Sequence, residues 1–197
     1  MTPIDLDDLA TTWFTFRRAV SSEDLAAAHA RINQSLTEDF GYGYVAEWHW
    51  DLDRLNVHYV DNPRQAMFIA ADSTGQAVGT AGIRIGAPTS VPPWLADRYV
   101  DRQRVAQLIR VTTMPDARGQ GVARRLVEAV RRFVVADGQY SFICLHTNVK
   151  VPTARPFWES LPTTLMHDAR ADEVDIRFET LHYELAIDRP IAFESTT

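Results

Sequence analysis

The order of predicted elements assigns this 197-residue chain to a single α/β domain with mixed strand pairing. Two apolar strands, Met67–Ala71 and Ala77–Ile85, flank the turn sequence Asp-Ser-Thr-Gly and predict an antiparallel hairpin. Further along, a strand at Gln107–Thr113, a helix at Gly121–Ala136 and a strand at Tyr140–Thr147 form a crossover unit. A hairpin followed by such a crossover requires antiparallel and parallel pairing in one sheet.

The elements before the hairpin are a strand, a helix and an irregular segment. Aromatic and β-branched residues predict a strand at Thr11–Val20. Hydroxyl and acidic residues at 21–24 then favour a helix start, and the helix is expected to run to about Leu36. The segment Thr37–Asp53 is acidic and aromatic and contains no Lys or Arg. We expect it to form a loop that leads into a short helix.

The crossover is followed by a short helix and the end of the sheet. Ala154–Leu161 predicts the helix, and Val174–Thr180 and Leu181–Ile187 predict a final strand or strand pair. No shift in composition marks a domain boundary. We therefore expect one domain over residues 1–197, with a core at about 11–187 and a flexible tail at 188–197.

The composition argues against several classes of function. A formal net charge of -6 disfavours a nucleic-acid partner, because phosphate contacts need clustered Lys and Arg. The N-terminal sequence lacks the features of a signal peptide, and no apolar run reaches the roughly 20 residues that cross a bilayer. These features predict a cytoplasmic protein without a membrane partner. The single cysteine, Cys144, excludes an internal disulfide, and the histidines lack metal-ligand spacing, so we expect no metal.

The turn before the central helix carries the clearest chemical signal, and it contains Gly119 and Gly121. The first N–H groups of a helix have no intrahelical partner, and the helix dipole adds positive potential there. Glycines leave room for a phosphate to approach, so the turn predicts an anion site. The glycines alone also fit a surface turn before a solvated helix. Arg124 stands where the dinucleotide-binding fingerprint has its third glycine, so that fingerprint is not matched.

The wider run, from the apolar strand through Pro115 into the amphipathic helix, resembles motif A of the GCN5-related N-acetyltransferases (GNAT family). The family pattern Arg/Gln-x-x-Gly-x-Gly/Ala is matched by Arg118, Gly121 and Ala123. Ala154–Leu161 is similar to the family helix Ala-x-x-Phe-Tyr-x-x-Leu. The resemblance extends over most of the chain. It implies a mixed, mostly antiparallel central sheet flanked by helices on both faces, acetyl-CoA as cosubstrate, and a monomer or homodimer.

The resemblance also implies where the coenzyme binds. The loop amides are expected to bind the pyrophosphate, and the strand before the loop is expected to pair with the pantetheine arm. A bulge in that strand is expected to direct an N–H at the thioester carbonyl. The expected coenzyme-binding residues are Val111, Thr112, Thr113, Arg118, Gly119, Gln120, Gly121, Val122, Ala123 and Arg124, with Leu145 to Thr147 on the far side.

The catalytic residues depart from the family pattern. Trp158 replaces the tyrosine that usually acts as the acid, and an indole N–H is a donor but not a useful acid. Direct attack by an amine requires a base or a water relay, and the candidates are Glu47, His49 and His146. The segment Thr37–Asp53 lies where this family builds its acceptor pocket. The residues expected to contact the amine are Tyr44, Glu47 and Trp48, since carboxylates and aromatic faces attract a cation.

Several functions remain open at this stage. The first is transfer of an acetyl group to a primary amine of a small molecule. The second is acetylation of a protein Lys or N-terminal amine, which would need an open groove. The third is a non-catalytic acyl-CoA-binding regulatory domain, which is consistent with Trp158 and with Val151 where the family often has asparagine. A nicotinamide-dependent oxidoreductase is a more distant alternative. Fold alone does not decide among them.

Overall fold

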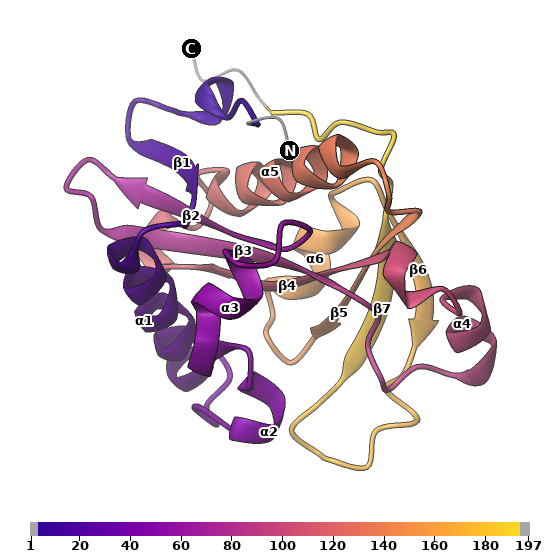
Figure 1. The fold of residues 1–197 in the computed structure, drawn as a ribbon. Coiled ribbons are helices and arrows are strands. Elements are labelled where there is room, and N and C mark those ends of the chain that lie inside the picture. The colour runs from indigo at the N-terminus through magenta and orange to yellow at the C-terminus, as the bar shows by residue number, and fades with distance from the viewer. Residues whose placement is uncertain (1–3, 194–197) are drawn as a thin grey trace.

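The computed structural model describes residues 4–193, and its centre is a seven-stranded sheet (Figure 1). The strand order is β1-β2-β3-β4-β5-β7-β6. The strands are β1 (Phe14–Arg18), β2 (Ala66–Asp72), β3 (Ala77–Ile85), β4 (Val105–Thr113), β5 (Phe142–Asn148), β6 (Thr163–Asp168) and β7 (Thr180–Leu185). All neighbouring strands are antiparallel except β4 and β5, which are parallel. The predicted mixed, mostly antiparallel sheet is therefore confirmed.

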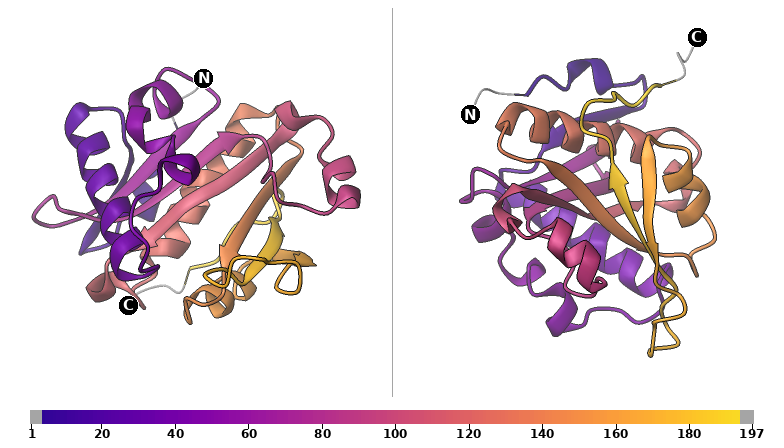
Figure 2. Two further views of the ribbon diagram at one scale, coloured as in Figure 1. Left: turned by 90° about the horizontal axis from the view of Figure 1, so that it is seen from below. Right: turned by 90° about the vertical axis from the view of Figure 1, so that its right-hand side faces the viewer.

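Helices cover both faces of this sheet, as predicted. The helices are α1 (Ser22–Glu38), α2 (Ala46–His49), α3 (Leu55–Tyr59), α4 (Pro93–Arg98), α5 (Val122–Asp137) and α6 (Ala154–Glu159). The long helix α5 packs on one face, whereas α1 and α3 pack on the other (Figures 1 and 2). Strand β2 shows how one sequence serves both layers, because alternate residues point to opposite faces. Phe68 and Ala70 join the core under α5, and Met67 and Ile69 join the core under α1.

The predicted strand at Val174–Thr180 is wrong. Residues 169–179 form a loop, and the sheet ends instead with the hairpin of β6 and β7. Val174 and Ile176 were apolar enough to indicate a strand, but their side chains are 96% and 86% exposed. Strand β6 was missed because it is an edge strand with a mostly exposed sequence, so its apolar pattern is weak. The short helix α3 was also not foreseen.

The C-terminal segment, expected to be a flexible tail from residue 188, lies along α5 as far as it is described. Ile191 is buried, and its N–H donates to Glu128 at 3.2 Å. Arg131 donates to the carbonyl of Ile187 at 2.8 Å. Residues 194–197 lie outside the described residues. Glu128 and Arg131 of α5 therefore bind the segment that follows β7.

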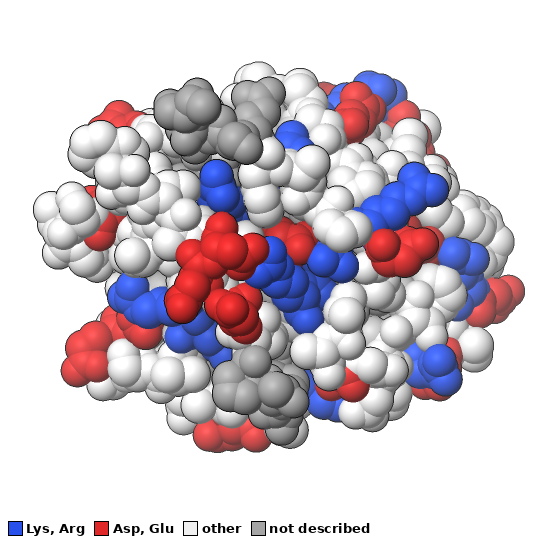
Figure 3. Space-filling view, turned by 90° about the horizontal axis from the view of Figure 1, so that it is seen from above, with Lys and Arg blue, Asp and Glu red and all other residues white. Residues whose placement is uncertain are grey.

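Glu128 is the centre of this network. Its carboxylate is buried and accepts two 2.7 Å hydrogen bonds from Arg131 and one at 3.1 Å from Arg132. Arg132 also pairs with Asp8 at the surface, at 2.5 Å. Acidic and basic side chains accordingly lie next to each other on the face shown in Figure 3. The network joins the N-terminal segment, α5 and the C-terminal segment.

Replacing Glu128 by Gln is expected to lower the free energy of unfolding by about 3 kcal/mol, because Arg131 would keep a buried charge without its partner. The matched control is Glu159→Gln, which breaks the exposed pair with Arg155 and should cost less than about 1 kcal/mol. Urea unfolding followed by circular dichroism measures both. Equal losses in the two variants would contradict the assigned role of Glu128.

Candidate active site

The central feature of the site is the separation of the two parallel strands. β4 and β5 pair only at Val105 with Phe142, Ala106 with Ile143, and Gln107 with Cys144. Beyond Gln107, β4 continues to Thr113 and stays paired with β3 on its other side. Among residues 4–193, no strand pairs with the β5-facing edge of β4 beyond Gln107. The backbone groups along this edge are thus available to an extended ligand.

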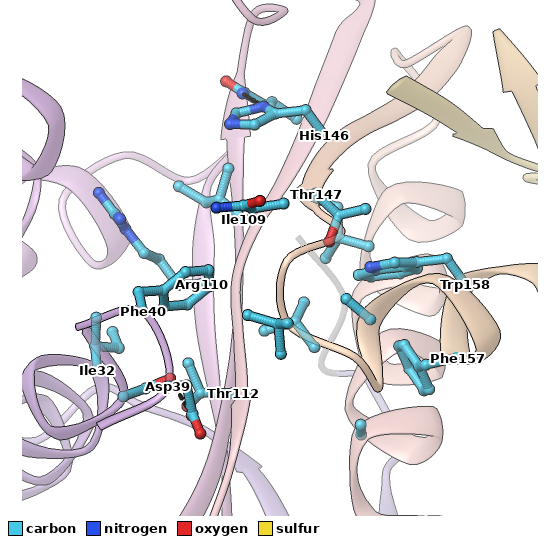
Figure 4. Close-up of a pocket in the computed structure, with 18 of the residues that line it drawn as sticks. Ile32, Asp39, Phe40, Ile109, Arg110, Thr112, His146, Thr147, Phe157 and Trp158 are labelled. Atoms are coloured by element: carbon cyan, nitrogen blue, oxygen red, sulfur yellow. Dashed lines mark hydrogen bonds between the residues drawn. The ribbon is translucent and has the colours of Figure 1, made fainter. Parts of the chain in front are cut away.

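The separated strands open a cleft of about 1690 Å³. Ile109 and Thr112 of β4 lie on one side of it, and Thr147 of β5 and Trp158 of α6 lie on the other (Figure 4). Helices α1 and α2 and the loop 169–179 also contribute to the lining. A pocket for one small ligand typically measures about 300–1,000 Å³. The cleft is large enough for a coenzyme and an acceptor together.

The start of α5 forms one end of the cleft. Gly119 and Gly121 both have positive φ angles, 74° and 76°, a conformation that favours glycine. No side chain of the described residues caps the first turn of α5. The N–H groups of this turn therefore lie at the surface of the cleft without a protein partner. Gly79 on β3 lets this turn approach the sheet closely, since an added Cβ would lie 3.1 Å from Val122. The arrangement is an anion site built from backbone.

The arginines of this loop make different contacts. Arg118 pairs with Asp39 at 2.5 Å and also reaches the carbonyl of Thr113. Arg124 donates to the neutral hydroxyl of Ser160 at 2.9 Å. The charge of Arg118 is therefore shared with a carboxylate, whereas Arg124 forms no ion pair with a carboxylate among residues 4–193. The positive potential at this end comes from Arg124 and from the helix start.

The expected bulge is present in β4, opposite Thr80–Gly82. Arg110 in the bulge has a φ of 56°, which a non-glycine residue rarely adopts. Its backbone carbonyl accepts a 2.7 Å hydrogen bond from the Thr80 hydroxyl. Its guanidinium forms an ion pair with Asp51, whose other partner is the Tyr59 hydroxyl at 2.6 Å. These contacts hold the unusual conformation in place.

The three candidate bases lie in different surroundings. His146 is two residues past the last residue of β5 that pairs with β4, and its side chain lines the cleft (Figure 4). Its side chain is exposed along the cleft, and desolvation by the surrounding residues lowers its pKa, with smaller contributions from neighbouring cations. His49 is buried, its Nδ1 accepts the Val45 N–H at 2.8 Å, and burial lowers its pKa to about 4. Glu47 is exposed and lies on α2 at the rim.

Two of the residues expected to contact an amine already have partners within the protein. Tyr44 donates to Asp53 at 2.7 Å and does not line the cleft. Trp48 lines the cleft, but the guanidinium of Arg177 lies 4.9 Å from its ring centroid. Two acids of the predicted acidic segment, Asp39 and Asp51, are paired with arginines. Two of the five carboxylates of this segment are thus neutralised by arginines and are not available to a cationic ligand.

The structure adds residues that the sequence did not single out for the site. Asp51 and Arg110 fix the bulge, and Gln107 marks the point at which the strands separate. Arg84 on β3 donates through Nε to Gln107 at 2.8 Å and lines the cleft. The only sequence signal for Arg84, Gln107 and Arg110 was a polar residue inside an apolar strand, which does not reveal its partner.

A sheet with this strand order, two parallel strands that separate and a glycine turn before the next helix have the arrangement expected of a GNAT acetyltransferase fold. A model of the Acetyltransferase (GNAT) family matches residues 29–161, which is more than half of the chain. The protein belongs to the GNAT acetyltransferase family. A search of curated protein sequences gave no match.

Solved structures share this fold at low sequence identity. A GNAT acetyltransferase from Staphylococcus aureus Mu50 superposes with a TM-score of 0.68 at 13% identity, covering 89% of this chain and 99% of that one. An acetyltransferase from Streptococcus agalactiae 2603 gives 0.66 at 18% identity, with coverages of 89% and 99%. A spermidine N-acetyltransferase from Vibrio cholerae, in complex with CoA and spermine, gives 0.61 at 18%, with coverages of 89% and 96%.

Within residues 4–193, no three His, Cys, Asp or Glu side chains are grouped so that they could hold a metal ion. In the same part of the chain, no helix has the length and apolar character needed to cross a membrane.

The buried histidines give stability a defined dependence on pH. Because the pKa of His49 is about 4 in the folded protein and about 6.5 when unfolded, the unfolded chain binds more protons between these values. His49 therefore contributes stability above pH 6.5 that is lost as the pH falls towards 4. In His49→Asn, the new amide oxygen can accept the Val45 N–H but does not titrate. Between pH 6.5 and 5, the free energy of unfolding of this variant should fall by about 2 kcal/mol less than that of wild type.

Urea unfolding at pH 7.5, 6.5 and 5 measures this difference. The matched control is His29→Asn on the exposed surface of α1, which should keep the wild-type dependence. Parallel pH curves for wild type and His49→Asn would contradict the assignment of a neutral buried imidazole.

Proposed function

We propose that this protein transfers an acetyl group from acetyl-CoA to a primary amine of a small molecule, by direct attack within a ternary complex. The observation that carries the proposal is the course of the unpaired β4 edge. It leads from the open helix start at Gly121 to the point near Gln107 where the strands separate, beside His146. A coenzyme bound along that edge has its pyrophosphate at the helix and its thioester beside the histidine.

The residues present fit coenzyme A. The N–H groups from Gly119 to Arg124 suit the pyrophosphate, because the helix dipole and Arg124 favour an anion. The backbone of Val111, Thr112 and Thr113 suits the amides of the pantetheine arm, as an added strand would. The bulge at Arg110 changes the direction of the backbone where the thioester carbonyl would lie, which suits an N–H that stabilises the developing oxyanion.

The acceptor end of the cleft is closed over by aromatic contacts, which favours a small molecule over a protein substrate. The ring centroids of Trp48 on α2 and Phe178 on the loop 169–179 lie 5.3 Å apart. The ring of Tyr42 also packs against Phe178, with 5.9 Å between the ring centroids. These contacts connect two segments from opposite sides of the cleft. A protein chain presenting a lysine would need this connection to open.

His146 is the proposed proton acceptor. The imidazole of His146 lines the cleft, and its lowered pKa keeps it neutral at pH 7, so a ring nitrogen is free to accept the proton that an attacking amine must lose. His49 is less suitable because its Nδ1 is already bonded and its ring is buried. Glu47 at the rim is suited to attracting the cationic amine and to relaying a proton outwards.

The leaving thiolate also needs a proton, and Trp158 cannot supply one. Protonated His146 is a strong acid at its lowered pKa, so it readily gives up the proton it has just accepted. We therefore propose that one histidine takes the proton from the amine and returns it to the thiolate or to water. This shuttle removes the need for a tyrosine at position 158.

The coenzyme site is tested by the double variant Gly119→Glu/Gly121→Glu. The new carboxylates would occupy the pyrophosphate position, so acetyl-CoA affinity measured by calorimetry should fall more than about 100-fold. The matched control is Gly75→Glu/Gly138→Glu, since both glycines also have positive φ angles and open space around them. Wild-type protein that fails to bind acetyl-CoA would refute the proposed function.

His146→Gln tests the proton acceptor. Loss of a positioned base should lower kcat at pH 7.5 about 100-fold or more, while the calorimetric affinity for acetyl-CoA stays unchanged. His29→Gln, at an exposed position on α1, should retain wild-type turnover. A His146 variant with full kcat would assign the role to Glu47 or to water.

A further inference from the structure

Arg84 is held rigidly at the acceptor end of the cleft. It lies on β3 opposite Gln107, and paired residues of neighbouring strands share a face of the sheet. Its Nε donates to the Gln107 side chain at 2.8 Å, and its guanidinium carbon lies 5.4 Å from the ring centroid of Trp50. These two contacts fix the plane of the guanidinium. They leave its two Nη groups without a hydrogen-bond acceptor among residues 4–193.

The charge of Arg84 has no direct counter-ion in the described structure. No carboxylate of residues 4–193 forms an ion pair with it, although Arg110 and Arg118, which line the same cleft, pair with Asp51 and Asp39. Arg84 is largely enclosed, and this burial lowers its pKa. Partial desolvation of a cation raises the free energy of the folded protein unless an anion pairs with it. The missing partner is therefore expected to come from a ligand.

The neighbours of Arg84 place this cation beside the reaction centre. Gln107 is buried, and its Nε2 lies 3.5 Å from Nδ1 of His146. A single side-chain amide thus separates the guanidinium of Arg84 from the imidazole of the proposed base. An acceptor whose anionic group is bound at Arg84 would have its nearby amine directed at His146. In an α-amino acid, one carbon atom separates the carboxylate from the amine.

We propose that Arg84 binds the carboxylate of the acceptor, and that the acceptors are small amino acids. This inference rests on the proposed acetyltransferase function. The two Nη groups match the two oxygens of a carboxylate. Trp50, whose side chain is 49% exposed, offers an apolar face to the rest of the acceptor. Asp172 and Glu173 on the loop 169–179 also line the cleft, and their negative charge disfavours a dianionic phosphate.

The experiment compares acceptors that differ only in their charge. Each of a panel of L-amino acids is assayed beside its carboxamide, with spermidine as an amine that lacks a carboxylate, by following thiol release from acetyl-CoA. The best amino acid is expected to exceed its amide about 10- to 100-fold in kcat/KM, which matches a charged hydrogen-bonded contact. Arg84→Gln should remove this preference, so that kcat/KM for the amino acid falls to about the value for its amide.

Two variants serve as controls. Arg84→Lys keeps the charge without the planar fork and should restore part of the preference. Arg104→Gln, at an exposed arginine that contacts Ser141, should behave as wild type. Unchanged acetyl-CoA affinity in the Arg84 variants, measured by calorimetry, shows that the coenzyme site is intact. Thermal shifts of the CoA-saturated protein with each acid and amide pair give a readout independent of turnover.

The outcomes separate the inference from the function on which it rests. Amides or spermidine that react as well as the amino acids, or an Arg84→Gln variant that keeps the preference, would overturn the role of Arg84 and leave the acetyltransferase intact. Equal thermal shifts for acids and amides would overturn it as well. Wild-type protein that does not bind acetyl-CoA would overturn both together.

Discussion

The separation of β4 and β5 beyond Gln107 is the constraint on which the rest of the site depends. Parallel strands normally stay paired, because each unpaired N–H and C=O in a sheet interior loses a hydrogen bond. Here β4 and β5 pair only over the first three residues of each strand, and β4 has a bulge at Arg110 beyond the paired stretch. The resulting edge is polar backbone that lines a cleft, which is the surface that an extended amide-bearing coenzyme needs.

The Arg110–Asp51 pair connects this edge to the other side of the cleft. It joins the bulge in β4 to the segment between α2 and α3, which carries Trp50 beside the cleft. A buried ion pair gains little net stability, because desolvation offsets much of its attraction. Its value here is positional, since it keeps a residue with a φ of 56° in place next to the cleft. The bulge is consequently tied by direct contacts to the segment around Asp51.

The electrostatics of the cleft follow from which charges are already paired. Asp39 forms an ion pair with Arg118, and Asp51 forms one with Arg110. The acidic segment therefore attracts a cation less strongly than its composition predicts. Arg84 and the rim residue Glu47 have no ion-pair partner among residues 4–193, and they carry opposite signs. A ligand that carries both an amine and a carboxylate matches this pair of charges, whereas a polycation matches only one of them.

The sequence by itself determined most of the local elements and the glycine turn before α5. The glycine turn, the amphipathic pattern of α5 and the β2–β3 hairpin depend on residues close together in the chain, so periodicity and motif spacing reveal them. The β6 edge strand was missed because its exposed sequence has little apolar pattern. Only the tertiary structure placed Arg84, Gln107 and His146 together, because strand register joins residues that are far apart in the chain. Tertiary contacts also decided which charges are neutralised, since a carboxylate is available to a ligand only where folding gives it no arginine.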